Sequence, residues 1–313
     1  MRVAWLYAGQ GSQRVGMGRD FYDAYPEARA IFDNPSADFD IRAVCFEAGL
    51  ETLSQTRYTQ PCMAAFAAAV TLLLKKSGFA PDFAAGLSLG EYSALYAAGA
   101  LSLDALLSIL ALRGAAMERS AQGVPSRMSA VLGLEADKVF EAVRSVSGAS
   151  PEAGVVSVTN INCPGQIVIG GTEDAVLAAE AQCLSLGAKR CLPLNTSGPF
   201  HTPLMENASR ELSDALDKIT LSPQLIPVVF NVTGATAADS DVRGLLCRQV
   251  KSPVLFERTI RTLAAMSVDT VVEIGPGRVL GGFVRKTAPE MRVLNIETTE
   301  DFEKTTEALR SFN

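Results

Sequence analysis

Residues 82–99 carry an apolar strand pattern, a serine bracketed by glycines and a helical pattern, in that order. The turn reads GLSLG, with Gly86 and Gly90 two positions on either side of Ser88. Such glycines permit a cramped strand-to-helix turn that holds the serine hydroxyl clear of its surroundings, as in enzymes that use the serine as a nucleophile. The same spacing suits a tight turn in which the serine only caps the helix, so the pattern by itself leaves both interpretations open.

Short apolar stretches alternate with longer helical patterns along the rest of the chain, which favours α/β architecture. Ser102 is a candidate N-cap, and Gly78, after Lys75 and Lys76, is a candidate helix end. The predicted strands are 3–8, 82–86, 226–232 and 270–275, and the predicted helices are 60–78, 89–99, 103–123 and 203–218.

Residues 125–197 form a separate pattern. We expect strands at 126–134, 154–161, 165–171 and 188–194, and helices at 137–147 and 173–187. The order βαββαβ is that of a ferredoxin-like unit. We therefore predict a large α/β-hydrolase-like domain with a parallel-sheet core, made of residues 1–124 and 198–313, and an inserted ferredoxin-like subdomain at 125–197.

Charge and composition exclude several classes of function. The 313 residues have a formal net charge of −6 and a pI near 5.1, which argues against nucleic acid as a partner. The longest apolar tract, residues 62–74, is shorter than the roughly 20 residues that a membrane span needs. The amino-terminal residues lack the apolar run of a signal peptide and the cysteines form no CxxC pair, so we expect a cytoplasmic protein with reduced thiols. One histidine without clustered ligands predicts no metal site, and no nucleotide-binding glycine motif occurs.

His201 is the single histidine of the chain, and it lies in a Gly-Pro loop before a predicted helix. A nucleophilic serine needs a base, so His201 is the only imidazole that could activate Ser88. The order serine before histidine matches the α/β-hydrolase arrangement. A structural role for a lone histidine stays open, and the sequence does not reveal which group would orient its ring.

Two further features could contribute to a site around Ser88. Arg113 shares a helical face with Leu106, Leu110 and Met117, where a cation must either meet an anion or reach out to solvent. The loop AGQGSQ, residues 8–13, follows the first strand and could supply a backbone N–H to an oxyanion, or bind phosphate.

Together these segments resemble the malonyl-CoA:acyl-carrier-protein transacylases of bacterial fatty-acid synthesis and the related acyltransferase domains of polyketide synthases. The likeness runs nearly from end to end. The segments that carry it are GQGSQ (9–13), TQP (59–61), GLSLGEYSAL (86–95), RGAAM (113–117), NINCPGQIVIGG (160–171), GPFHTPLM (198–205), RQVKSPV (248–254) and EIGPGRVL (273–280).

The resemblance implies roles for individual residues. Ser88 would carry the acyl group as an ester and His201 would be its base. The backbone N–H groups of Gln10 and Leu89 would form the oxyanion hole, and Arg113 would bind the malonyl carboxylate. The main-chain carbonyl of Gln249 would orient His201. The remaining residues expected to line the site are Gln60, Met117, Asn160, Asn162 and Phe200.

The resemblance also implies a monomeric enzyme without cofactor, which takes malonyl-CoA as substrate and acyl carrier protein, with its phosphopantetheine, as partner. Candidate basic residues for carrier docking are Lys189, Arg190, Arg278, Arg285 and Lys286.

Leu87 and Ala8 depart from the family, which commonly has histidine before the serine and proline before GQGSQ. A transferase serving a polyketide pathway, a thioester hydrolase with the same Ser-His pair and an idle interaction protein are the alternatives.

Overall fold

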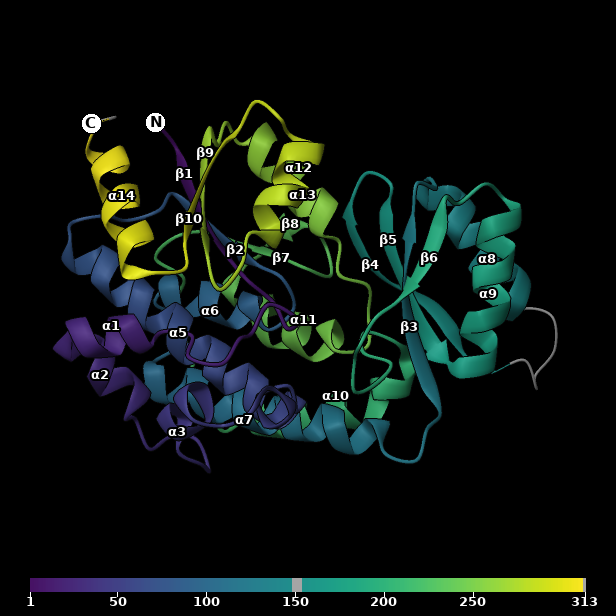
Figure 1. Cartoon of the computed structure of the whole chain (residues 1–313), viewed down its shortest axis with the longest axis horizontal. Coiled ribbons are helices and arrows are strands. Elements are labelled where there is room, and N and C mark those ends of the chain that lie inside the picture. Colours follow the sequence, from purple (N-terminus) through teal and green to yellow (C-terminus); the bar gives the residue numbers. More distant parts are fainter. Residues whose placement is uncertain (148–153, 312–313) are drawn as a thin grey trace.

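The computed structural model describes residues 1–147 and 154–311, which fold around a six-stranded and a four-stranded sheet (Figure 1). The strands are β1 Val3–Tyr7, β2 Phe83–Gly86, β3 Ser126–Leu132, β4 Val156–Cys163, β5 Gln166–Thr172, β6 Arg190–Pro193, β7 Val228–Phe230, β8 Ala235–Thr236, β9 Thr270–Ile274 and β10 Arg292–Ile296. The α-helices are α1 Arg19–Ala24, α2 Pro26–Phe32, α3 Ile41–Phe46, α4 Leu50–Leu53, α5 Thr56–Lys76, α6 Gly90–Ala97, α7 Leu103–Ala121, α8 Ala136–Ser147, α9 Glu173–Ser185, α10 Glu206–Leu216, α11 Val242–Gln249, α12 Phe256–Ala265, α13 Val279–Thr287 and α14 Thr299–Arg310. Two short 3₁₀ helices are η1 Pro203–Met205 and η2 Asp239–Asp241.

The six-stranded sheet has the order β10-β9-β1-β2-β7-β8, and all of its pairings are parallel except β7 with β8. Strand β1 is buried on both faces. Trp5 and Tyr7 point into one hydrophobic core, whereas Ala4 and Leu6 point into another, as the alternation of side chains along a strand requires. The predicted parallel-sheet core is therefore confirmed.

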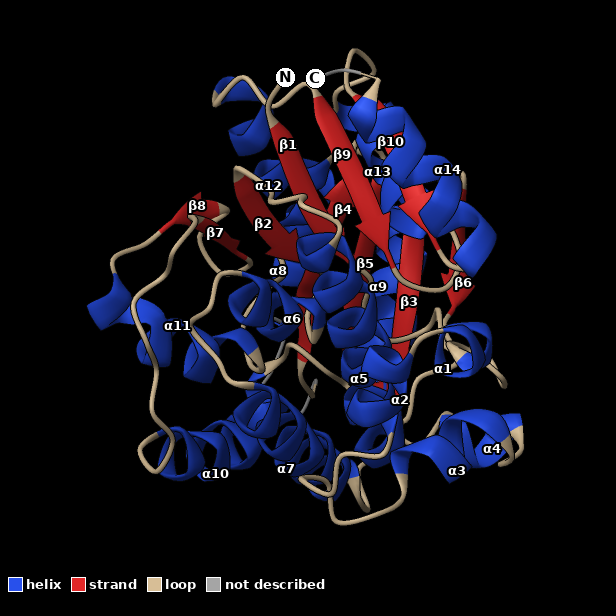
Figure 2. Ribbon diagram, turned by 90° about the vertical axis from the view of Figure 1, so that its left-hand side faces the viewer, coloured by secondary structure: helices blue, strands red, loops and turns tan. Residues whose placement is uncertain are grey.

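Helices cover both faces of this sheet. The first core takes in residues of α5, α7 and α10, and the second takes in residues of α12 and α13, which lie toward the four-stranded sheet (Figures 1 and 2). Because the parallel strands all point the same way, the loops after β1, β2 and β7 meet at one edge of the sheet. Any site built from these loops lies at this carboxyl edge.

The four-stranded sheet is antiparallel, with the order β4-β5-β3-β6, and α8 and α9 pack on it around a third core. The predicted element order βαββαβ is confirmed. Strand β4 is also hydrogen-bonded to the segment just before α12. The Ile161 N–H donates to Val254 O at 2.9 Å, and the Val254 N–H donates to Thr159 O at 2.9 Å. The predicted domain boundaries, 1–124 and 198–313 for one unit and 125–197 for the other, stay predictions.

Some predicted elements differ from the structure. Helix α5 begins at Thr56 rather than at 60, so Pro61 lies inside it. Burial of Thr56 and Thr59 stabilises the added turn, which comes before the proline. The predicted helix 203–218 is split into η1 and α10. Strands β8 and β10 were not predicted. Within the described residues, no helix is both long and apolar enough to cross a membrane.

Strand β1 begins and α14 ends at the same edge of the six-stranded sheet, at the amino ends of the parallel strands (Figure 1). This edge is opposite the carboxyl edge described above.

Candidate active site

Ser88 lies in the sharp turn between β2 and α6. Its backbone adopts φ 54°, a left-handed conformation that costs a non-glycine residue of order 1–3 kcal/mol. The flanking glycines are required by space: a Cβ on Gly86 would lie 2.0 Å from the carbonyl carbon of Gly90, and a Cβ on Gly90 would lie 2.3 Å from Tyr7 O. Residues 86–90 thus form a strained turn, called the elbow below, which packs closely against the end of β1.

His201 pairs with Ser88 across the two halves of the chain. Nδ1 of His201 lies 2.7 Å from Gln249 O and donates to it, because a carbonyl can only accept. Nε2 is then the unprotonated nitrogen, and it accepts the Ser88 hydroxyl proton at an Oγ–Nε2 distance of 2.8 Å. Burial, and secondly the charge of Arg113, lowers the pKa of His201 from 6.5 to about 4. The ring is therefore a neutral base at neutral pH.

Arg113 is buried, with 1% of its surface exposed, and does not reach solvent. Its Nη1 donates to Gln60 Oε1 at 2.7 Å. Its Nη2 donates to Gln249 Oε1 at 2.9 Å and to Ser88 Oγ at 3.1 Å. The guanidinium also stacks over the Tyr92 ring, 5.4 Å from its centroid. Burial lowers the pKa of this arginine, so the site holds a desolvated cation directly beside the serine oxygen.

Two backbone N–H groups flank Ser88 without an intramolecular acceptor. Neither Gln10 N–H nor Leu89 N–H donates to any residue that the structure describes. Gln10 follows β1, the neighbour of β2, and Leu89 opens α6, where the helix dipole favours negative charge. Free N–H groups at such a place can bind an oxyanion.

The structure brings most of the predicted residues together. Gln60 bridges Arg113 and Met117, with its Nε2 3.4 Å from Met117 Sδ. Gln249 contacts four groups of the site: its carbonyl binds His201, and its side chain binds Arg113, Ser88 O at 2.9 Å and Asn231.

Other predicted residues lie at the margin. Phe200 is buried next to His201. Asn160 and Asn162 lie on β4 of the four-stranded sheet and make no recorded hydrogen bond to Ser88, His201 or Arg113, although Asn162 Oδ1 is buried without a partner among the described residues. Leu87 is half-buried and packs on Gly9 and the second core, so the position is apolar.

Sequence reasoning missed two residues. Asn231 follows β7 and is fully buried, and it binds both Ser88 N–H and Gly86 O. Glu91 is also fully buried, and it accepts the Asn231 N–H. Burial raises the pKa of Glu91 to about 8. The only available signal was a polar residue at the end of a buried strand and an acid in the helix after the elbow.

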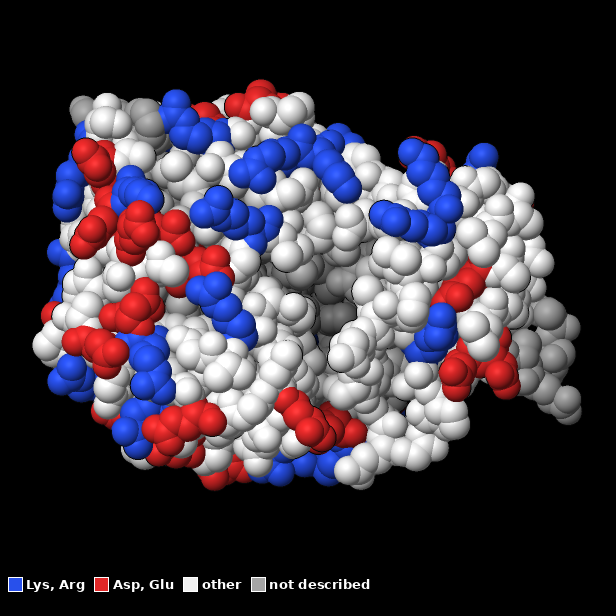
Figure 3. Space-filling view, viewed as in Figure 1, with Lys and Arg blue, Asp and Glu red and all other residues white. Residues whose placement is uncertain are grey.

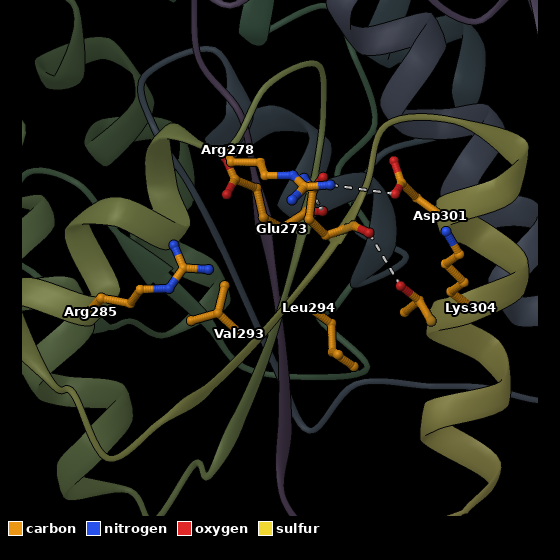
Figure 4. A pocket seen from close by; sticks show the side chains of 9 residues that line it. Glu273, Arg278, Arg285, Val293, Leu294, Asp301 and Lys304 are labelled. Atoms are coloured by element: carbon orange, nitrogen blue, oxygen red, sulfur yellow. Dashed lines mark hydrogen bonds and ion pairs between the residues drawn. The ribbon is translucent and has the colours of Figure 1, made fainter.

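A separate cavity of about 200 Å³ opens beside β9, β10 and α14 (Figure 4); the docking candidates Arg278 and Arg285 line it, but none of the residues placed around Ser88 does. Glu273 accepts N–H groups of Leu280 and Gly281 at 2.9 and 2.7 Å, and Asp301 pairs with Arg278 at 3.7 Å. These acids hold α13 and α14 against the sheet. Nowhere in residues 1–147 and 154–311 do three or more metal-ligating side chains gather into a cluster.

The arrangement around Ser88 supports acyl transfer through a serine ester. It combines a nucleophile, a neutral base held in one tautomer, two free N–H donors and a buried cation. The cation favours an acyl group that carries its own negative charge, because a buried guanidinium pairs best with a carboxylate.

Comparisons with known proteins agree with this chemistry. The model of the acyl transferase domain family matches residues 4–306. The malonyl CoA-acyl carrier protein transacylase of Bacillus subtilis (strain 168) is 38% identical over 315 residues, which cover 100% of this chain and 98% of that protein. The crystal structure of MCAT from Streptococcus pneumoniae has a TM-score of 0.93 and 40% identity, covering 98% of this chain and 100% of that one. A malonyl-transacylase in complex with its type II PKS acyl-carrier protein has a TM-score of 0.94 and 32% identity, covering 98% and 100%.

Proposed function

The chain belongs to the acyl transferase domain family, and we propose that it transfers the malonyl group of malonyl-CoA to the phosphopantetheine thiol of acyl carrier protein. The relatives that carry the name malonyl CoA-acyl carrier protein transacylase support both substrate and partner. Within the site, the observation that carries the malonyl assignment is Arg113, a buried cation 3.1 Å from the oxygen of Ser88.

The first half-reaction acylates the enzyme. Ser88 Oγ attacks the thioester carbonyl carbon of malonyl-CoA while His201 Nε2 takes the hydroxyl proton. The N–H groups of Gln10 and Leu89 stabilise the oxyanion, and losing one such donor typically costs ~10²–10³ in rate. The C–S bond then breaks, His201 returns the proton to the CoA sulfur, and the malonyl ester remains on Ser88 with its carboxylate on Arg113.

The second half-reaction reverses these steps with a different thiol. His201 takes the proton of the phosphopantetheine thiol, and the sulfur attacks the ester carbonyl. The Ser88 C–O bond breaks and His201 protonates the departing Oγ. His201 thus acts as base and as acid in each half, which requires that its ring stays in one orientation. The hydrogen bond from Nδ1 to the carbonyl of Gln249 holds the ring in that orientation.

Two alternatives share the same Ser-His pair. A thioester hydrolase would pass the acyl group to water, and the relatives named as transacylases weigh against it. A transferase serving a polyketide pathway would differ only in its carrier, and we propose fatty-acid synthesis as the pathway. We also propose a cytoplasmic location. We further propose that the reaction needs no bound cofactor, since every step above uses only protein groups and the two substrates.

Covalent labelling by radiolabelled malonyl-CoA tests the proposal. Wild type should retain label after denaturation, and Ser88→Ala should retain none. Ser93→Ala is the matched control, because Ser93 is a buried serine on α6, the helix that follows Ser88, and its Oγ has no partner among the described residues. Label on Ser88→Ala would overturn the assignment. Release of labelled malonate to water, faster than transfer to the carrier thiol, would support the hydrolase instead.

A further inference from the structure

Two buried side chains hold the elbow: Gln249 Nε2 donates to Ser88 O at 2.9 Å, and Asn231 binds the backbone on both sides of the turn. Oδ1 of Asn231 accepts the Ser88 N–H at 2.8 Å, and Nδ2 of the same amide donates to Gly86 O at 2.7 Å. These two backbone groups bracket the turn at Gly86–Ser88, where the chain leaves β2 and enters its left-handed conformation. A two-point contact of this kind fixes both sides of the strained residue.

Asn231 is itself fixed by other residues: besides the contact of its Oδ1 with Gln249 Nε2 at 3.4 Å, its backbone makes two hydrogen bonds. Its N–H donates to Glu91 Oε2, and its carbonyl accepts the Leu255 N–H at 2.9 Å. Glu91 lies in the first turn of α6, three residues after Ser88, so the elbow, the helix that follows it and Asn231 form a closed ring of hydrogen bonds. Asn231 and Glu91 are fully buried and Ser88 is partly buried, so a hydrogen bond lost by either buried side chain is not readily replaced by water.

We propose that Asn231 is a positioning residue, whose side-chain amide holds the Ser88 elbow so that Oγ faces His201. The role rests on Ser88 being the nucleophile of the proposed transfer. It needs an amide: one atom must accept from Ser88 N–H and the other must donate to Gly86 O. An ionised aspartate would oppose the Gly86 carbonyl, and an apolar residue would leave both backbone groups unpaired.

The test measures the reactivity of Ser88 with a fluorophosphonate, which labels a nucleophilic serine whatever its natural acyl group. Asn231→Leu should lower the labelling rate by about 10²-fold, because misplacing a reacting group by about 1 Å has an effect of that size. The matched control is Thr259→Val, which removes the hydrogen bond from the buried Thr259 to Leu255 O, on the side of Asn231 away from the elbow. It should label like wild type.

Asn231→Asp provides a second test that a merely structural role would not pass. A protonated carboxyl can accept from Ser88 N–H and donate to Gly86 O, as the amide does. The titratable groups facing this position are Glu91, whose pKa burial raises to about 8, the cation Arg113, and His201, which stays neutral down to about pH 4. The labelling rate of Asn231→Asp relative to wild type should therefore rise as pH falls from about 8 to 5.5, by up to about tenfold per pH unit above the carboxyl's pKa.

Three results would overturn the proposal. They are a folded Asn231→Leu that labels within about twofold of wild type, an equal loss in Thr259→Val, and an Asn231→Asp ratio that does not change with pH. If Asn231→Leu does not fold, the pH series of Asn231→Asp decides alone. Wild type that reacts with the fluorophosphonate but transfers no malonyl group would refute the proposed function while leaving this comparison valid.

Discussion

His201 and Arg113 influence each other through their charges. Burial, followed by the guanidinium of Arg113, keeps the pKa of His201 near 4. When a substrate carboxylate pairs with Arg113, it offsets the positive charge, so the pKa of the histidine should rise. In the proposed mechanism the base would then be strengthened only when the bound acyl group carries a carboxylate, so Arg113 would couple substrate charge to base strength.

The pH dependence of Ser88 reactivity follows from this coupling. With a fluorophosphonate, which has no carboxylate, the labelling rate of wild type should be flat from about pH 8 to 5 and fall toward pH 4 as His201 is protonated. In Arg113→Met the fall should begin at higher pH, because the cation that lowers the histidine pKa is gone. Labelling followed by mass spectrometry gives both profiles. A wild-type midpoint near 6.5, the ordinary histidine value, would contradict the prediction.

Arg113 should also set the acyl preference. Arg113→Ala should lower kcat/KM for malonyl-CoA by roughly 10- to 100-fold, the usual value of a hydrogen bond to a charged group, and should raise the relative rate with acetyl-CoA. Arg119→Ala is the control, because Arg119 lies on the same helix but is exposed and pairs with Glu211. An unchanged preference in Arg113→Ala would mean that the arginine has a structural role.

Glu91 should make stability depend on pH. Burial raises its pKa from 4.5 to about 8, so between these values the folded state holds a proton that the unfolded state has lost. Its contribution is present below about pH 4.5 and is lost as pH rises toward 8. In Glu91→Gln the free energy of unfolding should therefore vary less with pH over this range. Urea unfolding of both proteins at several pH values measures it, and parallel curves would refute the assignment.

Among the elements, the β2–α6 turn tolerates little change. Gly90→Ala should destabilise the protein by about 1–3 kcal/mol, because the new Cβ would lie 2.3 Å from a backbone carbonyl that cannot move easily. Gly244→Ala, on α11 with open space around it, should instead be neutral or stabilising. Urea unfolding compares the two. Equal stability of the two variants would show that the elbow can expand.

All of the described strands except β8 and β10 were predicted, because their local patterns are strong, whereas no bounds were predicted for α1–α4 or α11–α14. β1, β2 and α7 were predicted to within two residues of each end, and the Ser102 N-cap is confirmed by its contact with Ala105 N at 3.1 Å. Strand β8 is only Ala235–Thr236, and β10 is an edge strand that begins with an exposed arginine. Neither has the apolar run that reveals a buried strand.

Only part of the candidate site could be predicted from the sequence. Ser88 lies in a recognisable turn and His201 is the only histidine, but the role of Arg113 depended on the family resemblance. Asn231 could not be found, since its contact with Ser88 spans 143 positions and exists only once β7 has paired with β2. Local patterns do not encode such a contact.

For the whole molecule, the two sheets leave a hollow between them (Figure 3). In the same view as Figure 1 it lies beside α11, whose last residue is Gln249. Lys and Arg side chains flank it above α13 and on the side of the four-stranded sheet. The exposed candidates on these elements are Arg278, Arg285 and Lys286 at α13, and Lys189 and Arg190 at the start of β6. A basic rim of this kind can attract an acidic carrier to a protein of net negative charge.

Charge reversal tests the rim. Arg285→Glu with Lys286→Glu should raise KM for the carrier protein and leave KM for malonyl-CoA unchanged, because rim charges act mainly on association. Lys76→Glu is the control: Lys76 ends α5, at the amino ends of the strands, away from the hollow. Steady-state kinetics at two salt concentrations would measure the effect. An unchanged carrier KM would place docking elsewhere.

The positions of the chain ends have a consequence for protein engineering. Strand β1 begins and α14 ends at the amino edge of the sheet, whereas Ser88 lies at the carboxyl edge. A peptide fused to either end therefore starts on the side remote from the hollow. A carrier protein or a second enzyme could be joined to either terminus on a linker long enough to reach round the domain, and a bridge between the two ends would allow circular permutation.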